Sequence, residues 1–213
     1  MSTIRLNHVT KSFRGAAVLR DICLEFRSGG IYGIVGENGS GKTMLLRAVS
    51  GLIVPSSGTV TVDGAVLHRD ISFPPEIGIL IEKPEFLGHL SGLKNLSLLA
   101  EIRSVISTEK IADLMRLFAL DPGSPKPMRK YSLGMRQKIG IIQAIMEDQK
   151  ILVLDEAFNS LDEYTVGLLR ELLLAYKKQG KLIILTSHNS EDIACLCDCV
   201  HRISGGRIVS REE

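Results

Sequence analysis

The pattern of apolar and polar positions changes in character along the chain. In residues 1–30 the two kinds alternate, as in ICLEF at residues 22–26, and SGG at residues 28–30 supplies a turn. This part therefore predicts two or three antiparallel strands. Continuous apolar runs follow, including IYGIV at residues 31–35 and ILVL at residues 151–154. Such runs are typical of strands that are buried on both faces.

Segments with helical spacing of apolar residues separate the later strands. Helices are expected after the glycine-rich stretch that ends at residue 43, over residues 91–102 and 107–120, from Tyr131 to about Glu147, over residues 163–178, and near residues 191–197. Either Ser107 or Thr108 caps the third of these. Short hairpins are expected at Asp63-Gly64 and at Gly205-Gly206.

Alternating strands and helices predict an α/β fold with a mainly parallel sheet flanked by helices. An antiparallel β subdomain at the N-terminus and an inserted α-helical subdomain complete the expected architecture. We expect one domain over residues 1–213, with the core in 1–81 and 136–213 and the helical insertion in 82–135.

Composition and charge narrow the function classes. The 213 residues are 45% hydrophobic and 23% charged, and the net charge is +2, so no strong basic field favours nucleic acid as a partner. The N-terminus lacks the apolar core of a signal peptide, and no run approaches the roughly 18 apolar residues of a membrane span. We expect the chain to stay in the cytoplasm.

Three of the four cysteines form the cluster CLCDC at Cys195, Cys197 and Cys199. Zinc sites usually combine two separated Cys/His pairs, whereas the remaining cysteine, Cys23, lies in a predicted strand. We interpret the cluster as buried or half-buried thiols where a short helix runs into a strand.

The segment GENGSGKT matches the phosphate-loop pattern G-x-x-x-x-G-K-[ST] between a predicted strand and a predicted helix. Backbone N–H groups of such a loop point at phosphate oxygens, the lysine meets the β/γ charge and the threonine holds Mg²⁺. The residues concerned are Gly36, Glu37, Asn38, Gly39, Ser40, Gly41, Lys42 and Thr43.

Two carboxylates, Asp155 and Glu156, end the buried run ILVLDE at the edge of the sheet where ligands bind in α/β folds. Asp155 would hold Mg²⁺, directly or through water, and Glu156 would deprotonate an attacking water. The alternative is a pair of helix caps. His188 follows another buried strand and is expected to contact a γ-phosphate, the alternative being an ordinary surface or core histidine.

The order of these motifs resembles that of the ATP-binding subunits of ABC transporters over nearly the whole chain. The phosphate loop, a turn at Glu82, YSLGM at residues 131–135, ILVLDE, NSLD at residues 159–162 and His188 follow in that family's sequence. The resemblance implies a P-loop NTPase fold and an ATPase that uses ATP and Mg²⁺. It also implies a second ATP-binding subunit and a membrane permease as partners, at the cytoplasmic face of the membrane.

The resemblance also implies roles for single residues. It implies catalytic roles for Lys42, Glu156 and His188. Besides the phosphate loop, the residues expected to bind nucleotide are Phe13, Ser132, Gly134, Met135 and Asp162. The expected metal ligands are Thr43, Asp155 and Glu82. Phe13 would stack on adenine, the alternative being a core aromatic. In the family, the signature loop, here YSLGM, contacts the γ-phosphate of ATP held by the opposite subunit. The alternative for its serine is an ordinary helix cap.

Three positions depart from the family pattern. Leu133 replaces a glycine, Met135 replaces a glutamine whose hydrogen bonds it cannot make, and Glu82 stands where a glutamine is usual. A carboxylate at position 82 would substitute for an amide near Mg²⁺, whereas near the γ-phosphate its charge would repel. We expect slow hydrolysis.

The combination of LIEKP, YSLGM and NSLD is similar to the branch that exports drugs, antimicrobial peptides or lantibiotics. Two other functions compete with transport. Soluble ATPases of the superfamily that act on DNA or ribosomes carry long coiled-coil insertions or fused halves, which are absent here. A small-molecule kinase would leave YSLGM and NSLD unexplained.

Overall fold

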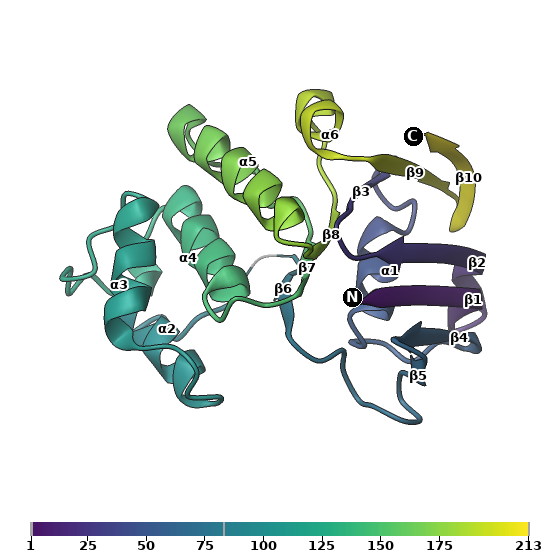
Figure 1. Ribbon diagram of the computed structural model, residues 1–213, viewed down its shortest axis with the longest axis horizontal. Coiled ribbons are helices and arrows are strands. Elements are labelled where there is room, and N and C mark those ends of the chain that lie inside the picture. Colours follow the sequence, from purple (N-terminus) through teal and green to yellow (C-terminus); the bar gives the residue numbers. More distant parts are fainter. Residues whose placement is uncertain (1, 83, 213) are drawn as a thin grey trace.

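The computed structural model describes residues 2–82 and 84–212, and its strands form two sheets. Four strands form an antiparallel sheet in the order β2-β1-β4-β5, at one end of the molecule (right in Figure 1). They are β1 (Thr3–Phe13), β2 (Ala16–Arg27), β4 (Ser57–Val62) and β5 (Ala65–Val66). The turn between β4 and β5 has positive φ at both Asp63 and Gly64, which confirms the hairpin predicted there.

The second sheet has six strands in the order β10-β9-β3-β8-β7-β6. All its neighbouring strands pair in parallel except β10 with β9, so the mainly parallel sheet is confirmed. Its members are β3 (Ile31–Val35), β6 (Ile77–Leu80), β7 (Ile151–Leu154), β8 (Leu182–Leu185), β9 (Cys199–Ser204) and β10 (Arg207–Glu212). Every residue of β7 and β8 is buried, as their apolar runs predict.

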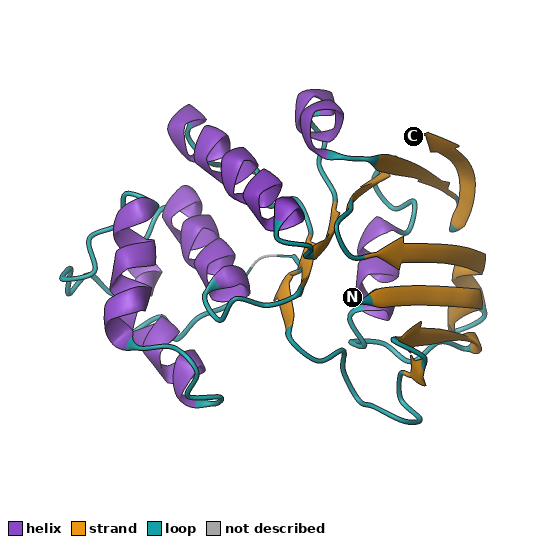
Figure 2. Ribbon diagram, viewed as in Figure 1, coloured by secondary structure: helices purple, strands orange, loops and turns teal. Residues whose placement is uncertain are grey.

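Six α-helices accompany the described strands, and Figure 2 shows most of them on the side away from the antiparallel sheet. They are α1 (Lys42–Val49), α2 (Gly92–Glu101), α3 (Thr108–Leu117), α4 (Leu133–Ile145), α5 (Glu163–Lys178) and α6 (Ser190–Leu196). Of the two candidate caps for α3, the structure selects Ser107, whose Oγ accepts the Lys110 N–H. No helix of the described chain is long and apolar enough to cross a membrane.

The core lies on both faces of the parallel sheet. Along β7, Leu152 and Leu154 join one apolar cluster with the helical part of the chain, and Ile151 and Val153 join the other with the antiparallel sheet. Helix α4 lies directly on β6, because a Cβ added at Gly78 would be 1.8 Å from the carbonyl oxygen of Ala144. The sheet therefore fixes the position of α4.

The cysteine cluster is only partly as predicted. Cys199 is buried and Cys197 half-buried, but Cys195 is exposed. The prediction was wrong for Cys195 because it treats the three positions alike, whereas Cys195 lies in α6, which covers the sheet with one side only. Cys23 is exposed on β2.

Candidate nucleotide-binding site

The phosphate loop joins β3 to α1 and closes around the ammonium group of Lys42. Its Nζ donates hydrogen bonds to the carbonyl oxygens of Gly36 (2.7 Å) and Glu37 (3.1 Å). Glycine is required at position 36, because an added Cβ would be 2.2 Å from the carbonyl oxygen of Ile203. Gly41 has a φ of 115° immediately before α1. The loop is thus a tight turn that ends at a helix N-terminus, which favours an anion.

The side chains of this loop fit Mg²⁺ and a nucleotide phosphate. The buried Oγ of Ser40 has no hydrogen-bond partner among the described residues, although buried hydroxyls normally have one. Thr43 Oγ1 donates to Asp155 Oδ2 at 2.7 Å, and Thr186 Oγ1 donates to the other carboxylate oxygen at 2.6 Å. A hydroxyl beside an oriented carboxylate supplies the oxygen ligands that Mg²⁺ uses in phosphate sites.

Glu156 is held between an imidazole and an amide. Its Oε1 lies 2.7 Å from His188 Nε2, and its Oε2 accepts the Nδ2–H of Asn159 at 2.6 Å. Its backbone N–H donates to Thr186 Oγ1 at 2.9 Å. The structure therefore brings Glu156 and His188 together, beside Asp155. Helix α5 is capped by Asp162 instead, so the helix-cap alternative for the two strand-end carboxylates is excluded for that helix.

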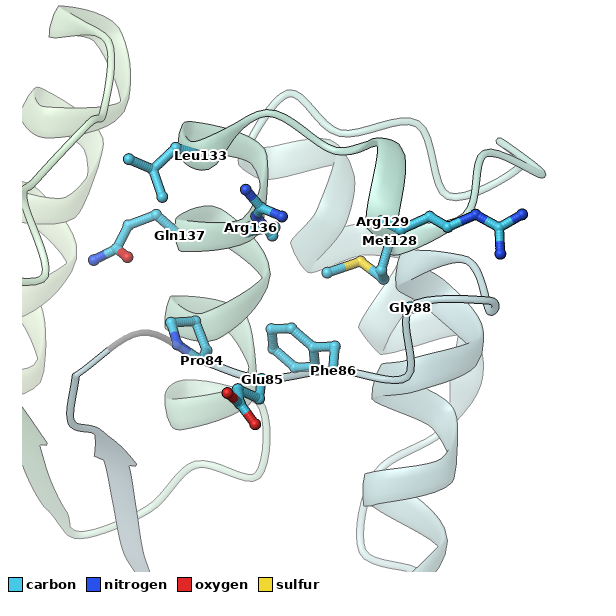
Figure 3. Close-up of a pocket in the computed structure, with 9 residues that line it drawn as sticks. All are labelled: Pro84, Glu85, Phe86, Gly88, Met128, Arg129, Leu133, Arg136 and Gln137. Atoms are coloured by element: carbon cyan, nitrogen blue, oxygen red, sulfur yellow. The ribbon is translucent and has the colours of Figure 1, made fainter.

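A cavity of about 550 Å³ connects these groups with α4. Its lining consists of Thr43, Glu82, Glu85, Leu133, Gln137, Asp155, Glu156, Asn159 and Ser160. A neighbouring cavity of about 400 Å³ lies between α4 and the segment after β6, and Figure 3 shows its lining. The expected metal ligands Thr43, Glu82 and Asp155 thus surround one space.

Glu82 has a cationic partner that the sequence did not reveal. Its Oε1 forms an ion pair of 2.7 Å with Arg47 Nη2, and its φ is 59°. Arg47 lies four residues after Thr43 on α1, so both side chains project from the same face of that helix. A carboxylate at position 82 would repel a nearby γ-phosphate. The Arg47 guanidinium offsets this negative charge.

The signature loop begins α4. Ser132 is exposed, and its Oγ accepts the Met135 N–H at 3.2 Å, so it does cap the helix. Gly134 approaches the loop after β7, because an added Cβ would be 2.5 Å from the Ser160 carbonyl oxygen. Leu133 is 48% exposed. A serine and a helix start that face solvent remain accessible to a second molecule.

Phe13 is not a core residue. Its side chain is 47% exposed at the end of β1, with Lys11 Nζ 4.8 Å from the ring centroid. This exposure contradicts the core-aromatic alternative. Its stacking on adenine stays a prediction.

Comparison with known proteins decides the family. A family model described as ABC transporter matches residues 19–159, most of the chain. The chain belongs to this family. Among its relatives, the ABC transporter ATP-binding protein YybJ of Bacillus subtilis (strain 168) is 43% identical over 99% of this chain and 96% of its own. The bacitracin transport ATP-binding protein BcrA of Enterococcus faecalis is 32% identical over 97% of this chain and 68% of its own.

A solved dimeric structure of the ATP-binding cassette MJ0796, bound to ADP and Pi after hydrolysis, superimposes with a TM-score of 0.85. It is 20% identical and covers 99% of this chain and 98% of its own, so it shows a shared fold. As an ABC transporter ATP-binding subunit, the protein binds ATP with Mg²⁺ and hydrolyses ATP. The predicted P-loop NTPase fold is thereby confirmed.

In this ABC ATPase, Asp162 has partners within its own chain. Its carboxylate accepts from Lys138 Nζ (2.7 Å) and from the N–H and hydroxyl of Thr165, and these bonds hold its pKa well below its usual range. The nucleotide contact expected for Asp162 stays a prediction.

Sequence reasoning missed four further residues around the site: Arg47, Gln137, Asn159 and Thr186. Thr186 carried a signal, since a hydroxyl follows the buried run of β8, next to β7, which ends at Leu154 immediately before Asp155. Asn159 begins the NSLD stretch, but no role was expected for it there. Arg47 and Gln137 belong to none of the motifs quoted above.

Proposed function

We propose that this chain is the ATP-hydrolysing subunit of an exporter of drugs or antimicrobial peptides. Two such subunits close around two Mg-ATP molecules and drive a separate membrane permease at the cytoplasmic face. The observation that carries the proposal is the pairing of Glu156 with His188 beside Thr43 and Asp155, together with a solvent-facing Ser132.

Each side chain has a task that its contacts support. Lys42 and the loop amides hold phosphate charge, and Mg²⁺, when bound, neutralises part of that charge. Glu156 accepts a proton from the attacking water, and His188 keeps the carboxylate oriented. Thr43 and Asp155 would hold the metal, with Glu82 available from the same cavity.

The start of α4 supports a two-subunit site. Ser132 and the amides that follow it are the groups that bind an anion at a helix N-terminus. Because Ser132 faces solvent, the γ-phosphate of a second subunit's ATP fits this position. Leu133 adds an exposed apolar side chain to the surface that would be covered.

The permease and the cargo are proposed from the comparisons and from surface chemistry. The printed name of BcrA describes bacitracin transport, and this chain aligns with 68% of that protein. The lining of the cavity in Figure 3 includes apolar Phe86 and Met128, the cation Arg136 and the carboxylate residue Glu85, whereas the guanidinium of Arg129 points away from it. A short cytoplasmic permease segment with apolar and acidic side chains would suit this lining.

Light scattering of purified Glu156→Gln protein, with and without Mg-ATP, tests the proposal. Blocking hydrolysis is expected to trap a closed dimer, so the mass should double on addition of Mg-ATP. Glu109→Gln, an exposed position on α3, is the matched control and should stay monomeric. A Glu156→Gln protein that binds ATP but stays monomeric would contradict the two-copy arrangement.

A further inference from the structure

One face of α4 is attached to the loop that follows Glu156 in the same chain. Gly134 packs against the carbonyl oxygen of Ser160, and Lys138 Nζ bonds Asp162 Oδ2 at 2.7 Å. Gln137 lies between Gly134 and Lys138 in the sequence, at the spacing that places all three positions on one face of the helix. The loop is therefore held directly against α4.

Gln137 makes the contact nearest to the reacting groups. Its Nε2 donates to the carbonyl oxygens of Glu156 and Ala157, both at 3.1 Å. In Figure 3 its side chain points to the same side of α4 as that of Leu133, one turn earlier. Both side chains line the 550 Å³ cavity together with the Glu156 carboxylate.

The backbone of Glu156 needs such support. Its φ is 51°, in the left-handed region that a residue with a side chain adopts only when its surroundings enforce it. Thr186 Oγ1 accepts its N–H, and Gln137 Nε2 donates to its carbonyl oxygen. The residue is thus held at both ends of its backbone while its carboxylate reaches His188.

We propose that Gln137 is a positioning residue for Glu156. By fixing two consecutive carbonyl groups, it keeps the carboxylate in place to accept the proton of water. Resting on the proposed function, the inference goes further: Ser132, the N-cap of α4, is the residue proposed to contact the partner subunit's nucleotide. Gln137 would then join the nucleotide read by Ser132 to the catalytic carboxylate of its own subunit.

Other contacts already hold α4 in the fold, so Gln137 is not needed for that purpose. Ile139 and Ile142 are fully buried in the core, and Gly78 lies against Ala144. Gln143, on the same helix, is also half-buried, but its side chain makes no hydrogen bond with the described residues. Gln143→Met is therefore a matched control for Gln137→Met.

Steady-state ATPase kinetics of the purified full chain test the role. Gln137→Met and the isosteric Gln137→Glu, which lacks the amide donor, should lower kcat about tenfold to a hundredfold with KM for ATP within about twofold. Gln143→Met should leave both constants within about twofold. Thermal unfolding of the three variants checks that the fold is kept, and two variants at position 137 guard against one that fails to fold.

The outcomes separate this inference from the proposed function. An unchanged kcat for both variants at position 137, or a rise in KM alone, would overturn the positioning role. Mg-ATP should still dimerise Glu156→Gln protein that also carries Gln137→Met, because nucleotide binding does not use the Gln137 amide. If kcat falls as expected but Glu156→Gln protein never dimerises, the positioning role stands, whereas the link between subunits and the two-copy proposal both fail.

Discussion

Two helical glycines, Gly134 in α4 and Gly167 in α5, differ in the space that is available for a side chain. Glycine lowers helix stability relative to alanine, so each invites the same replacement. At Gly134 an added Cβ would be 2.5 Å from the Ser160 carbonyl oxygen, a distance that real Cβ atoms essentially never show. At Gly167 no atom outside its immediate helical surroundings lies within 4 Å of that Cβ.

We therefore predict opposite effects for the two alanine variants. Gly167→Ala should raise the free energy of unfolding by about 0.5–1 kcal/mol, through propensity alone. Gly134→Ala should lower that free energy and also weaken Mg-ATP-driven dimerisation in the Glu156→Gln background, because the signature loop must move. Urea unfolding and light scattering measure the two effects; a stabilising Gly134→Ala would refute the close approach.

At the residue scale, the sequence predicted the groups whose chemistry is carried by local motifs. Lys42, Thr43, Asp155 and Glu156 stand next to the strands and helix that place them, so spacing was enough. The ion pair of Glu82 with Arg47 and the bonds of Gln137 to the Glu156 backbone could not be predicted, because each joins segments far apart in the chain. The effect of Glu82, which stands where the family usually has glutamine, could not be interpreted from the sequence without its ion-pair partner Arg47.

Helices α5 and α6 are joined by a charge cluster that also supports the His188 segment. Arg170 bonds Asp192 Oδ1 through Nε (3.0 Å) and Nη2 (2.6 Å), and it bonds Glu191 Oε1 through Nη1 at 3.0 Å. Asp192 is 1% exposed, and its other carboxylate oxygen accepts from Ser187 Oγ. Ser187 immediately precedes His188, so the cluster orders the chain where it reaches Glu156.

Removing the guanidinium should cost far more than removing its exposed partner. Arg170→Met leaves a buried carboxylate without its cation and is predicted to lower the free energy of unfolding by about 3 kcal/mol. Glu191→Gln removes a partner whose side chain is 70% exposed and should cost less than about 1 kcal/mol. Chemical denaturation of both variants measures the two losses in the free energy of unfolding. Equal losses would mean that the buried Arg170–Asp192 ion pair contributes no more than the exposed Arg170–Glu191 pair.

At the element scale, periodicity was a good guide to type and a poorer guide to ends. The apolar runs of β3, β7 and β8 and the helical spacing of α2, α3 and α5 were confirmed. Two candidate caps at Ser107 and Thr108 stayed open because both have a hydroxyl side chain; only the observed bond to Lys110 N–H chose between them. The order of strands in the sheet has no signature in periodicity.

Over the whole molecule, the nucleotide site draws on both strand-rich and helical regions. Figure 1 places β6, β7 and β8 between the antiparallel sheet and helices α2 and α3. Residues 82–135 contain α2, α3 and the start of α4, but α4 also packs on β6. The division into a core and a helical insertion stays a prediction, because helical spacing does not show which helices pack on the sheet.

Because Mg-ATP binds the folded chain, it should stabilise the protein as a whole. At a free concentration of about one hundred times Kd, linkage predicts about 2.7 kcal/mol of added stability. Thermal unfolding of Glu156→Gln protein should therefore shift upward with Mg-ATP, and the shift should vanish when Lys42→Met is added. A shift that persists without the lysine would place the nucleotide elsewhere.

The uneven burial of the four thiols has a practical consequence. Burial raises the pKa of the Cys197 thiol to about 12, and a Cβ added at Gly33 would lie 2.9 Å from its Sγ; Cys199 is buried as well. Maleimide probes should therefore attach only to Cys23 on β2 and Cys195 on α6. The native chain thus carries two sites for spectroscopic labels, one on the antiparallel sheet and one beside the His188 segment, with which the proposed closure of two subunits can be tested in real time.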